Sequence, residues 1–291
     1  MRALAAPTSL KSVLSATAAA DALAAGLRAG GAEAVAMPVA DGGDGTLDVL
    51  GGEPRVTEVS APLGGRVSAR WSLLDDRTAV VESAQALGFA TVDRLDPLRA
   101  SSRGLGELVL AAAREARALL VCLGGTVTVD GGAGLREVLD ELPLPTRVAC
   151  DVMAPLADAV DVYAAQKGAR PEDLPALRER LRGLPDVAGA GAAGGLGAAF
   201  AALGAELVPG AQLVLDTIGF DPRGFDLVVT AEGAVDDTTF AGKAPGEVVR
   251  RCREAGVRCE LVSARDDLSG DPSRAAEDLF ELARSLAHSL R

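Results

Sequence analysis

The first forty residues, MRALAAPTSLKSVLSATAAADALAAGLRAGGAEAVAMPVA (Met1–Ala40), decide the fold because they contain a strand, a helix and a second strand in that order. Residues 1–7 are a short apolar run that ends at a proline. Residues 8–30 have the apolar spacing of a helix, with Ser and Thr near its start and two glycines after its end. Residues 32–40 are another apolar run. These lengths predict a βαβ unit with a parallel pair of strands.

The same order recurs near the other end of the chain. Residues 225–230 (FDLVVT) are strand-like, residues 231–237 (AEGAVDD) form a polar loop, residues 245–256 favour a helix and residues 257–264 favour a strand. We therefore predict a Rossmann-like, parallel-sheet α/β domain that both chain ends build together, from residues 1–58 and 206–291.

The middle of the chain has a different pattern. Residues 56–84 alternate in hydrophobicity around Gly-Gly and Asp-Asp turns, which indicates antiparallel hairpins. Residues 106–125 predict a helix and then a buried strand, and residues 166–186 predict a charged, helix-rich excursion. We expect residues 59–205 to be an inserted mixed α/β domain, so the predicted fold class is α/β with two α/β domains.

Composition limits the partners of this chain. The 291 residues carry a net charge of −12, and no basic stripe is available to neutralise nucleic acid or an anionic membrane. We therefore expect neither partner; the oligomeric state stays open.

No apolar run reaches the roughly 18–20 residues of a membrane span. The N-terminus resembles a signal peptide only superficially, since Pro7 and Lys11 interrupt it, and we expect a cytoplasmic protein.

Cysteine and histidine usage narrows the chemistry. The four cysteines show no CxxC spacing and lie mostly in apolar runs, so we expect buried free thiols in a reducing compartment. The single histidine, His288, lies in the predicted terminal helix, which excludes His-based triads and His-rich metal sites.

Four glycine-rich turns follow apolar runs: ADGGDGT (40–46), LGGTVTVDGGAG (123–134), GAGAAGGLGAAF (189–200) and AEGAVDDTTFAGKAP (231–245). Glycine lets successive N–H groups converge on an anion, but α/β folds also need glycine at turns between strands and helices. Four such turns, three of them with acids, favour a ligand site. No Walker A motif is present. Residues 189–194 match GxGxxG with Asp216 beyond, but a poor first strand precedes them, which favours a close-packed helix start over a dinucleotide site.

Acids and lysines add to this pattern. Carboxylates directly after strand-like runs gather at the carboxyl edge of a parallel sheet, where they can hold Mg²⁺ or act as a base. Each one alone is equally consistent with an N-cap or a turn residue. Lysines are scarce, and a compact ammonium suits phosphate. The acids are Asp41, Asp44, Asp130, Asp151, Glu232 and Asp236, and the lysines are Lys11, Lys167 and Lys243.

Seven collinear segments resemble the type I glycerate kinase family: APTSLKSVLSA, PVADGGDGT, LGGTVTVDGGAG, CDVMAPL, QKGA, GAAGGLGAA and LVVTAEGAVDDTTFAGKAP. The resemblance covers nearly the whole chain. It implies an ATP- and Mg²⁺-dependent kinase that phosphorylates a small hydroxy acid, with D-glycerate and its 2-hydroxyl as first candidates. It also implies two α/β domains with the active site in the cleft between them.

The resemblance implies roles for individual residues. Asp41 or Asp151 accepts the proton of the substrate hydroxyl, Lys11 pairs with the substrate carboxylate, and Glu232 and Asp236 hold Mg²⁺ directly or through water. The nucleotide is bound by the glycine-rich turns, the following acid, and the residues near GKAP. These cofactor-binding residues are Gly124, Gly125, Asp130, Gly194, Gly195, Thr239 and Lys243.

The chain also departs from the family pattern. Polar residues are missing at positions expected to face ligands, namely Val129, Ala154, Ala231 and Ala234, and a strand is missing between residue 267 and the last helix. The alternative is therefore a paralogue that binds a nucleotide or a small acid but transfers no phosphoryl group.

Overall fold

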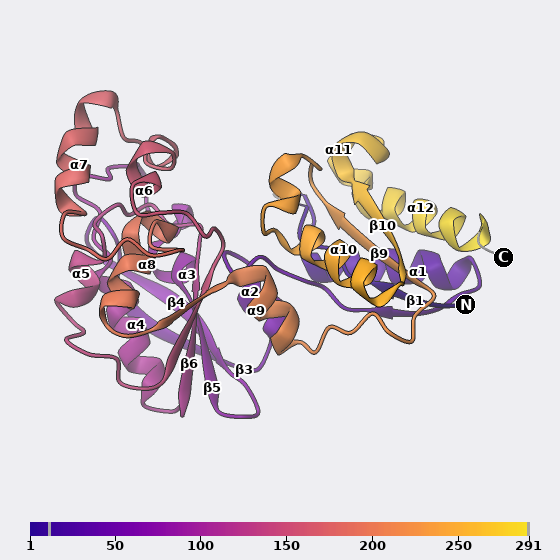
Figure 1. The fold of residues 1–291 in the computed structure, drawn as a ribbon, viewed down its shortest axis with the longest axis horizontal. Helices are drawn as coiled ribbons and strands as arrows, with labels where there is room; N and C mark the ends of the chain where they lie inside the picture. Colours follow the sequence, from indigo (N-terminus) through magenta and orange to yellow (C-terminus); the bar gives the residue numbers. More distant parts are fainter. Residues whose placement is uncertain (11–12, 290–291) are drawn as a thin grey trace. The chain divides into compact units, whose positions relative to one another are not determined.

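The computed structural model describes residues 1–10 and 13–289. The chain divides into two compact units (Figure 1), Met1–Asp41 with Val214–Arg291, called unit 1, and Gly42–Leu213, called unit 2. Unit 1 contains a parallel sheet built from both chain ends, and unit 2 contains a mixed sheet, which confirms the predicted fold class. The division lies at 41/42 and 213/214, not at 58/59 and 205/206, because β3 and β8 are the two edge strands of the second sheet.

Unit 1 has a four-stranded sheet in the order β10-β9-β1-β2, with every pair parallel. Its strands are β1 (Arg2–Ala5), β2 (Glu33–Ala36), β9 (Leu227–Glu232) and β10 (Arg258–Ser263). Its helical segments are α1 (Ala16–Ala29), η4 (Asp237–Phe240), α10 (Ala244–Ala255), α11 (Ala264–Asp267), η5 (Pro272–Arg274) and α12 (Ala275–Ser289). No strand occurs in residues 264–289, all of which the structure describes.

Helices cover both faces of this sheet. Leu23 and Leu27 of α1 and Leu279 of α12 form one core with Leu227 and Val229 of β9. Helix α10 contacts β9 and β10 as well, but none of its residues belongs to that cluster, so α10 covers the opposite face. The predicted first helix was too long at its start, because α1 begins only after Ser15, whose hydroxyl accepts the N–H of Ala18 at 3.1 Å.

Unit 2 has a six-stranded sheet in the order β3-β4-β5-β6-β7-β8. The first two pairings are antiparallel, as residues 56–84 predicted, and the other three are parallel. The strands are β3 (Glu53–Ser60), β4 (Arg66–Leu73), β5 (Thr78–Glu82), β6 (Ala118–Leu123), β7 (Thr146–Cys150) and β8 (Glu206–Pro209).

The helical segments of unit 2 lie mostly in the connections between these strands. They are α2 (Thr46–Leu50), α3 (Ser83–Leu87), η1 (Phe89–Thr91), α4 (Arg103–Ala113), α5 (Ala133–Arg136), α6 (Asp158–Asp161), η2 (Ala165–Lys167), η3 (Pro171–Asp173), α7 (Leu174–Arg180) and α8 (Ala192–Ala202). Helix α9 (Gly210–Thr217) spans the division between the units.

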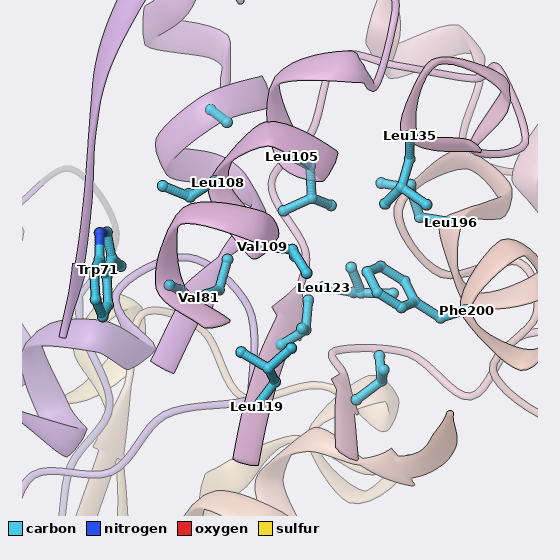
Figure 2. Packing of buried hydrophobic residues seen from close by; sticks show 14 of the residues in the cluster. Trp71, Val81, Leu105, Leu108, Val109, Leu119, Leu123, Leu135, Leu196 and Phe200 are labelled. Carbon is cyan, nitrogen blue, oxygen red and sulfur yellow. The ribbon is translucent and has the colours of Figure 1, made fainter. Parts of the chain in front are cut away.

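The largest core lies on one face of the six-stranded sheet (Figure 2). Leu105 and Val109 of α4 and Phe200 of α8 pack there against Val81 and Leu119 of the sheet. A smaller cluster with Leu47 and Leu213 covers the other face. Aliphatic side chains dominate both clusters.

Three sequence interpretations are settled at this level. Residues 189–191 form a turn with no strand in front of it, and Ala193, Gly194 and Gly195 interrupt the start of α8, so the GxGxxG match is not a Rossmann turn. The four cysteines are free, and Cys259 alone among them is only partly buried. No helix in the described part of the chain combines the length and the apolar character of a membrane span.

Candidate functional site

The strand order of unit 1 reverses between β1 and β9, because β2 is added on one side of β1 and β9 and β10 on the other. Ligands of open parallel sheets bind outside the carboxyl ends of the strands at such a point. The N–H and the hydroxyl of Thr8, just after β1, both donate to the carbonyl of Ala231 in β9, at 2.9 and 3.2 Å. The segment that follows β1 is thereby fixed beside Glu232, the last residue of β9.

Two carboxylates and one ammonium group meet at this point. Lys243 Nζ lies 3.6 Å from Glu232 Oε2 and 3.7 Å from Asp236 Oδ1. The Thr239 hydroxyl donates to Glu232 Oε1 at 2.5 Å and accepts the N–H of Asp236 at 3.1 Å. Hydrogen bonding from the Thr238 side chain and the nearby Lys243 charge lower the pKa of Asp236. Four of the predicted site residues therefore form one preorganised cluster, which we call the β9–α10 cluster (Glu232, Asp236, Thr239 and Lys243).

Asp41 lies beside this cluster in the same unit. Its Oδ1 accepts the N–H of Ala244, the first residue of α10, at 2.5 Å. A carboxylate is stabilised there because the first N–H groups of a helix are unpaired and its N-terminus carries a partial positive charge. This bond holds the Asp41 carboxylate at Ala244, the residue that follows Lys243 in the chain. Lys11, the third predicted catalytic residue, lies outside the described residues.

The β9–α10 cluster suits a metal ion that arrives with a phosphate ligand. Mg²⁺ is usually bound by one or two carboxylates, with water and substrate phosphate oxygens completing its shell. Glu232 and Asp236 supply that number. Across residues 1–10 and 13–289 no group of three or more His, Cys, Asp or Glu side chains converges as a metal site would require. These two carboxylates could hold Mg²⁺ only together with oxygen ligands from water or from a phosphate.

Unit 2 has a hollow at the carboxyl ends of β6 and β7. Gly124 and Gly125 follow β6, Asp151 follows β7, and Lys167 and Gly194 complete its wall. Its volume is about 90 Å³. Pockets that enclose a whole ligand usually measure roughly 300–1,000 Å³. The hollow is therefore smaller than a pocket that encloses a whole ligand.

Lys167 supplies the positive charge of this hollow. Its side chain is buried, and Nζ donates to Thr126 Oγ1 at 3.1 Å and to the Thr128 carbonyl at 2.9 Å. Burial lowers the pKa of Lys167 to about 8, and the carboxylates of Asp151 and Asp130 oppose that shift. A buried ammonium beside glycine turns is suited to binding an anionic oxygen.

The predicted glycines shape the hollow through close packing. A Cβ on Gly124 would lie 2.6 Å from Asp151 Oδ2, and one on Gly194 would lie 2.0 Å from the Thr128 carbonyl oxygen. Gly194 also has a φ of +72°, which side chains disfavour. Gly195 does not line the hollow; a Cβ there would lie 3.0 Å from the Cα of Gly131.

Asp130, predicted to bind the cofactor, points its carboxylate at protein donors. Oδ2 accepts the N–H and the hydroxyl of Ser102, each at 2.8 Å, and the N–H of Gly134 at 3.1 Å. Oδ1 accepts the N–H of Gly132 at 3.1 Å. Asp130 therefore fixes the turn before α5, and these bonds leave it little capacity to contact a nucleotide.

Sequence reasoning missed Glu82 and Ser83 at the carboxyl end of β5. The Ser83 hydroxyl donates to the Gly124 carbonyl at 3.0 Å and accepts the Gly124 N–H at 3.1 Å, so it holds the turn that lines the hollow. The run TAVVES was interpreted only as a hairpin strand. An acid directly after three buried apolar residues was the available signal.

Two of the four residues that depart from the family pattern do not face a ligand. Val129 is buried with Leu156 and Leu177, and Ala231 is buried in the core of unit 1. The expectation that these two positions face a ligand is therefore wrong, because the side chains at both fill apolar space. They give no reason to expect a silent protein.

Known proteins share sequence and fold with this chain. A family model described as the glycerate kinase family matches residues 3–144 and 141–287. Glycerate kinase of Halalkalibacterium halodurans is 34% identical, over 98% of this chain and 89% of the relative. Glycerate 2-kinase of Escherichia coli K12 is also 34% identical, over 84% and 80%. A crystal structure of a Salmonella typhimurium LT2 protein assigned as glycerate kinase 2 has a TM-score of 0.83 at 30% identity, covering 100% of this chain and 98% of that one.

Proposed function

This chain belongs to the glycerate kinase family, and from that premise we propose that it transfers the γ-phosphoryl group of ATP to the 2-hydroxyl of D-glycerate. The products are 2-phosphoglycerate and ADP. The observation that carries the proposal is the β9–α10 cluster, in which one ammonium group and two carboxylates meet at the strand-order reversal of unit 1. We propose the cytoplasm, which supplies ATP, as the place of the reaction.

Phosphoryl transfer needs positioning and charge neutralisation more than covalent help from the protein. In this proposal Glu232 and Asp236 would hold Mg²⁺, which would neutralise charge on the phosphates. Lys243 would contact a phosphate oxygen. Thr239 keeps Glu232 oriented throughout, because its hydroxyl donates to the Oε1 atom.

The remaining roles concern the substrate and the phosphate chain. Asp41, held by the N-terminus of α10, accepts the proton of the glycerate hydroxyl, and Lys11 pairs with the glycerate carboxylate. Gly124, Gly125, Gly194 and Lys167 bind phosphate oxygens in the hollow of unit 2. Asp151, whose Oδ2 packs on Gly124, is the second candidate for the base.

The test is direct measurement of ADP with ATP, Mg²⁺ and a panel of acids: D-glycerate, L-glycerate, lactate and tartronate. We expect turnover that requires D-glycerate and Mg²⁺, with phosphorus NMR identifying a 2-phosphate. Turnover on another acid alone would replace the substrate. Background ADP with every acid, from protein shown to be folded, would replace the kinase with a binding protein.

Asp41→Asn tests the assignment of the base. Asn keeps an acceptor for the N–H of Ala244 but cannot take a proton, so kcat should fall roughly 10²–10⁴-fold while the unfolding transition stays in place. Asp21→Asn, which removes a carboxylate from the exposed side of α1, is the matched control. Wild-type kcat in Asp41→Asn would move the role of base to Asp151.

A further inference from the structure

The parallel sheet of unit 1 ends at two edge strands, β2 and β10. An edge strand presents N–H and C=O groups that can pair with another chain, so folded proteins usually shorten, charge or cover such edges. After β10 the chain continues into α11, η5 and α12, and residues 264–289 contain no further strand. Among the residues that the structure describes, the outer side of β10 therefore has no neighbouring strand.

The β2 edge is protected against such pairing. This strand has only four residues, and Arg28 of α1 donates from Nε and Nη2 to the Ala34 carbonyl of β2 at 3.0 and 2.7 Å. A carbonyl that accepts two guanidinium N–H groups is already satisfied. β2 is therefore a poor template for a strand of another chain.

The β10 edge has no comparable protection. This strand has six residues, RCELVS (258–263), without proline or lysine. A side chain bonds the backbone only at the last of them, where the Ser263 N–H donates to Asp267 Oδ2 at 2.7 Å. Residues 259–261 are only partly buried. β10 is therefore an open edge that another strand can reach.

The sequence around Cys259 is self-complementary for antiparallel pairing. It reads VRCEL (257–261), which is apolar, basic, cysteine, acidic and apolar. In an antiparallel pair with its two-fold axis at Cys259, Arg258 of each copy lies opposite Glu260 of the other. Val257 lies opposite Leu261 in the same way. Opposite charges and apolar side chains that face each other directly across two strands stabilise their pairing.

Other symmetric registers lack this complementarity. Directly opposite residues of an antiparallel pair share a face of the sheet, and neighbours in a strand do not, so the axis must lie at a residue. An axis at Arg258 would place two guanidinium groups opposite each other, and an axis at Glu260 would place two carboxylates opposite each other. An axis at Leu261 would place Glu260 opposite Val262. The charges therefore select Cys259.

The two charged side chains already lie together within one chain. Arg258 Nε donates to Glu260 Oε1 at 2.9 Å, and the two side chains are 54% and 33% exposed. Residues two apart in a strand share a face of the sheet. Both groups therefore remain accessible to a second copy, and in the symmetric pair four charges of alternating sign surround the axis.

We propose that β10 is the interaction edge of a homodimer: it pairs antiparallel with β10 of a second copy about an axis at Cys259, and the two four-stranded sheets become one continuous sheet. The two Cys259 side chains then face each other on the sheet face opposite the four charges. This inference is independent of the proposed kinase activity, because none of the residues assigned to that activity lies in β10.

Sedimentation equilibrium of the full chain over a dilution series is the first test. We expect a species of twice the 29.4 kDa mass of one chain. Arg258→Glu places carboxylates opposite each other, so it should raise the Kd of the dimer roughly tenfold or more. Glu260→Arg should act likewise. The double variant Arg258→Glu/Glu260→Arg restores opposite charges and should return the Kd to within a few-fold of wild type.

Arg284→Glu is the matched control. Arg284 lies on α12, its side chain is 54% exposed like that of Arg258, and it pairs with Glu281 at 2.5 Å. The replacement changes the net charge by the same amount as Arg258→Glu, but it should leave the Kd of the dimer unchanged. Circular dichroism verifies that each variant is folded.

Hydrogen exchange of the wild-type protein is the second test, because it locates the contact. The outward N–H groups of β10 gain partners in the dimer, so residues 257–262 should exchange more slowly in concentrated than in diluted protein. Residues 33–36 of β2, the other edge of the same sheet, should exchange equally in both.

Three results would overturn the proposal. Wild-type protein that sediments at 29.4 kDa at every concentration forms no dimer. A dimer that is insensitive to Arg258→Glu, or that leaves the exchange of residues 257–262 unchanged, forms through another surface. A folded double variant that does not recover wild-type affinity overturns the register at Cys259. Each measurement has the same meaning whether or not any acid is phosphorylated.

Discussion

At the scale of single residues, Lys243 has both observed contacts in the β9–α10 cluster and a role in the proposed reaction. Its ammonium group lies 3.6 Å from a Glu232 oxygen and 3.7 Å from an Asp236 oxygen. In the proposed reaction a phosphate would compete for this ammonium group, and Mg²⁺ would compete for the two carboxylates. The Lys243 side chain therefore affects both the net charge of the cluster and the proposed binding of a phosphate.

Removal of this charge should impair turnover far more than stability. Lys243→Met should lower kcat/KM roughly 10²–10³-fold, the usual loss when one charge-stabilising group is removed. The side chain is about one-third exposed, so its ion pairs contribute little to folding. Steady-state kinetics and urea unfolding measure the two effects.

Arg250→Met is the matched control for this variant, since Arg250 is an exposed cation on α10, the helix that follows Lys243, and pairs with Glu247 and Glu254. It should retain wild-type kcat/KM. Equal losses in the two variants would mean that the net charge of α10 matters and that Lys243 has no specific role.

At the scale of elements, unit 1 depends on the close approach of α1 to α12. A Cβ on Gly26 would lie 2.1 Å from the Phe280 carbonyl oxygen and 2.9 Å from the Ala283 Cβ. Glycine in a helix usually costs about 1 kcal/mol relative to alanine. Its presence here is explained by packing, because the partner helix leaves no room for a methyl group.

Gly26→Ala should therefore destabilise the protein although alanine favours helices. We expect the free energy of unfolding to fall by about 1–3 kcal/mol, the usual cost of overpacking. Thr17→Ala, at an exposed position of the same helix, should stay within about 0.5 kcal/mol of wild type. Chemical denaturation followed by circular dichroism measures both. A Gly26→Ala protein more stable than wild type would contradict the close packing.

At the scale of the whole molecule, each unit has its own sheet and its own core. The single tryptophan, Trp71, is buried in the core of unit 2 (Figure 2). Its fluorescence therefore reports the unfolding of that unit alone, so the proposed binding of a nucleotide by the hollow can be tested without turnover.

ATP with Mg²⁺ at about 100 times its Kd should stabilise the Trp71 transition by about 2.7 kcal/mol, if it binds only folded protein. Lys167→Met should remove most of this gain, because the hollow then lacks its buried ammonium group. Unchanged stabilisation in Lys167→Met would assign nucleotide binding to other residues. Arg178→Met, which removes an exposed cation of unit 2, is the control.

The sequence by itself determined the fold class, the parallel sheet built from both ends, the antiparallel hairpins and the family, because these depend on periodicity and on motifs that are local in the chain. It also selected Glu232, Asp236, Thr239 and Lys243, since a short loop keeps them together. Only the tertiary structure decided that β3 belongs to the second sheet, that the oxygens of Asp130 accept protein donors, and that Val129 and Ala231 fill apolar cores. It also revealed Glu82, whose contact with Gly45 joins segments 37 residues apart. Burial and strand pairing are properties of the packed chain, and a single sequence does not show which distant segments meet.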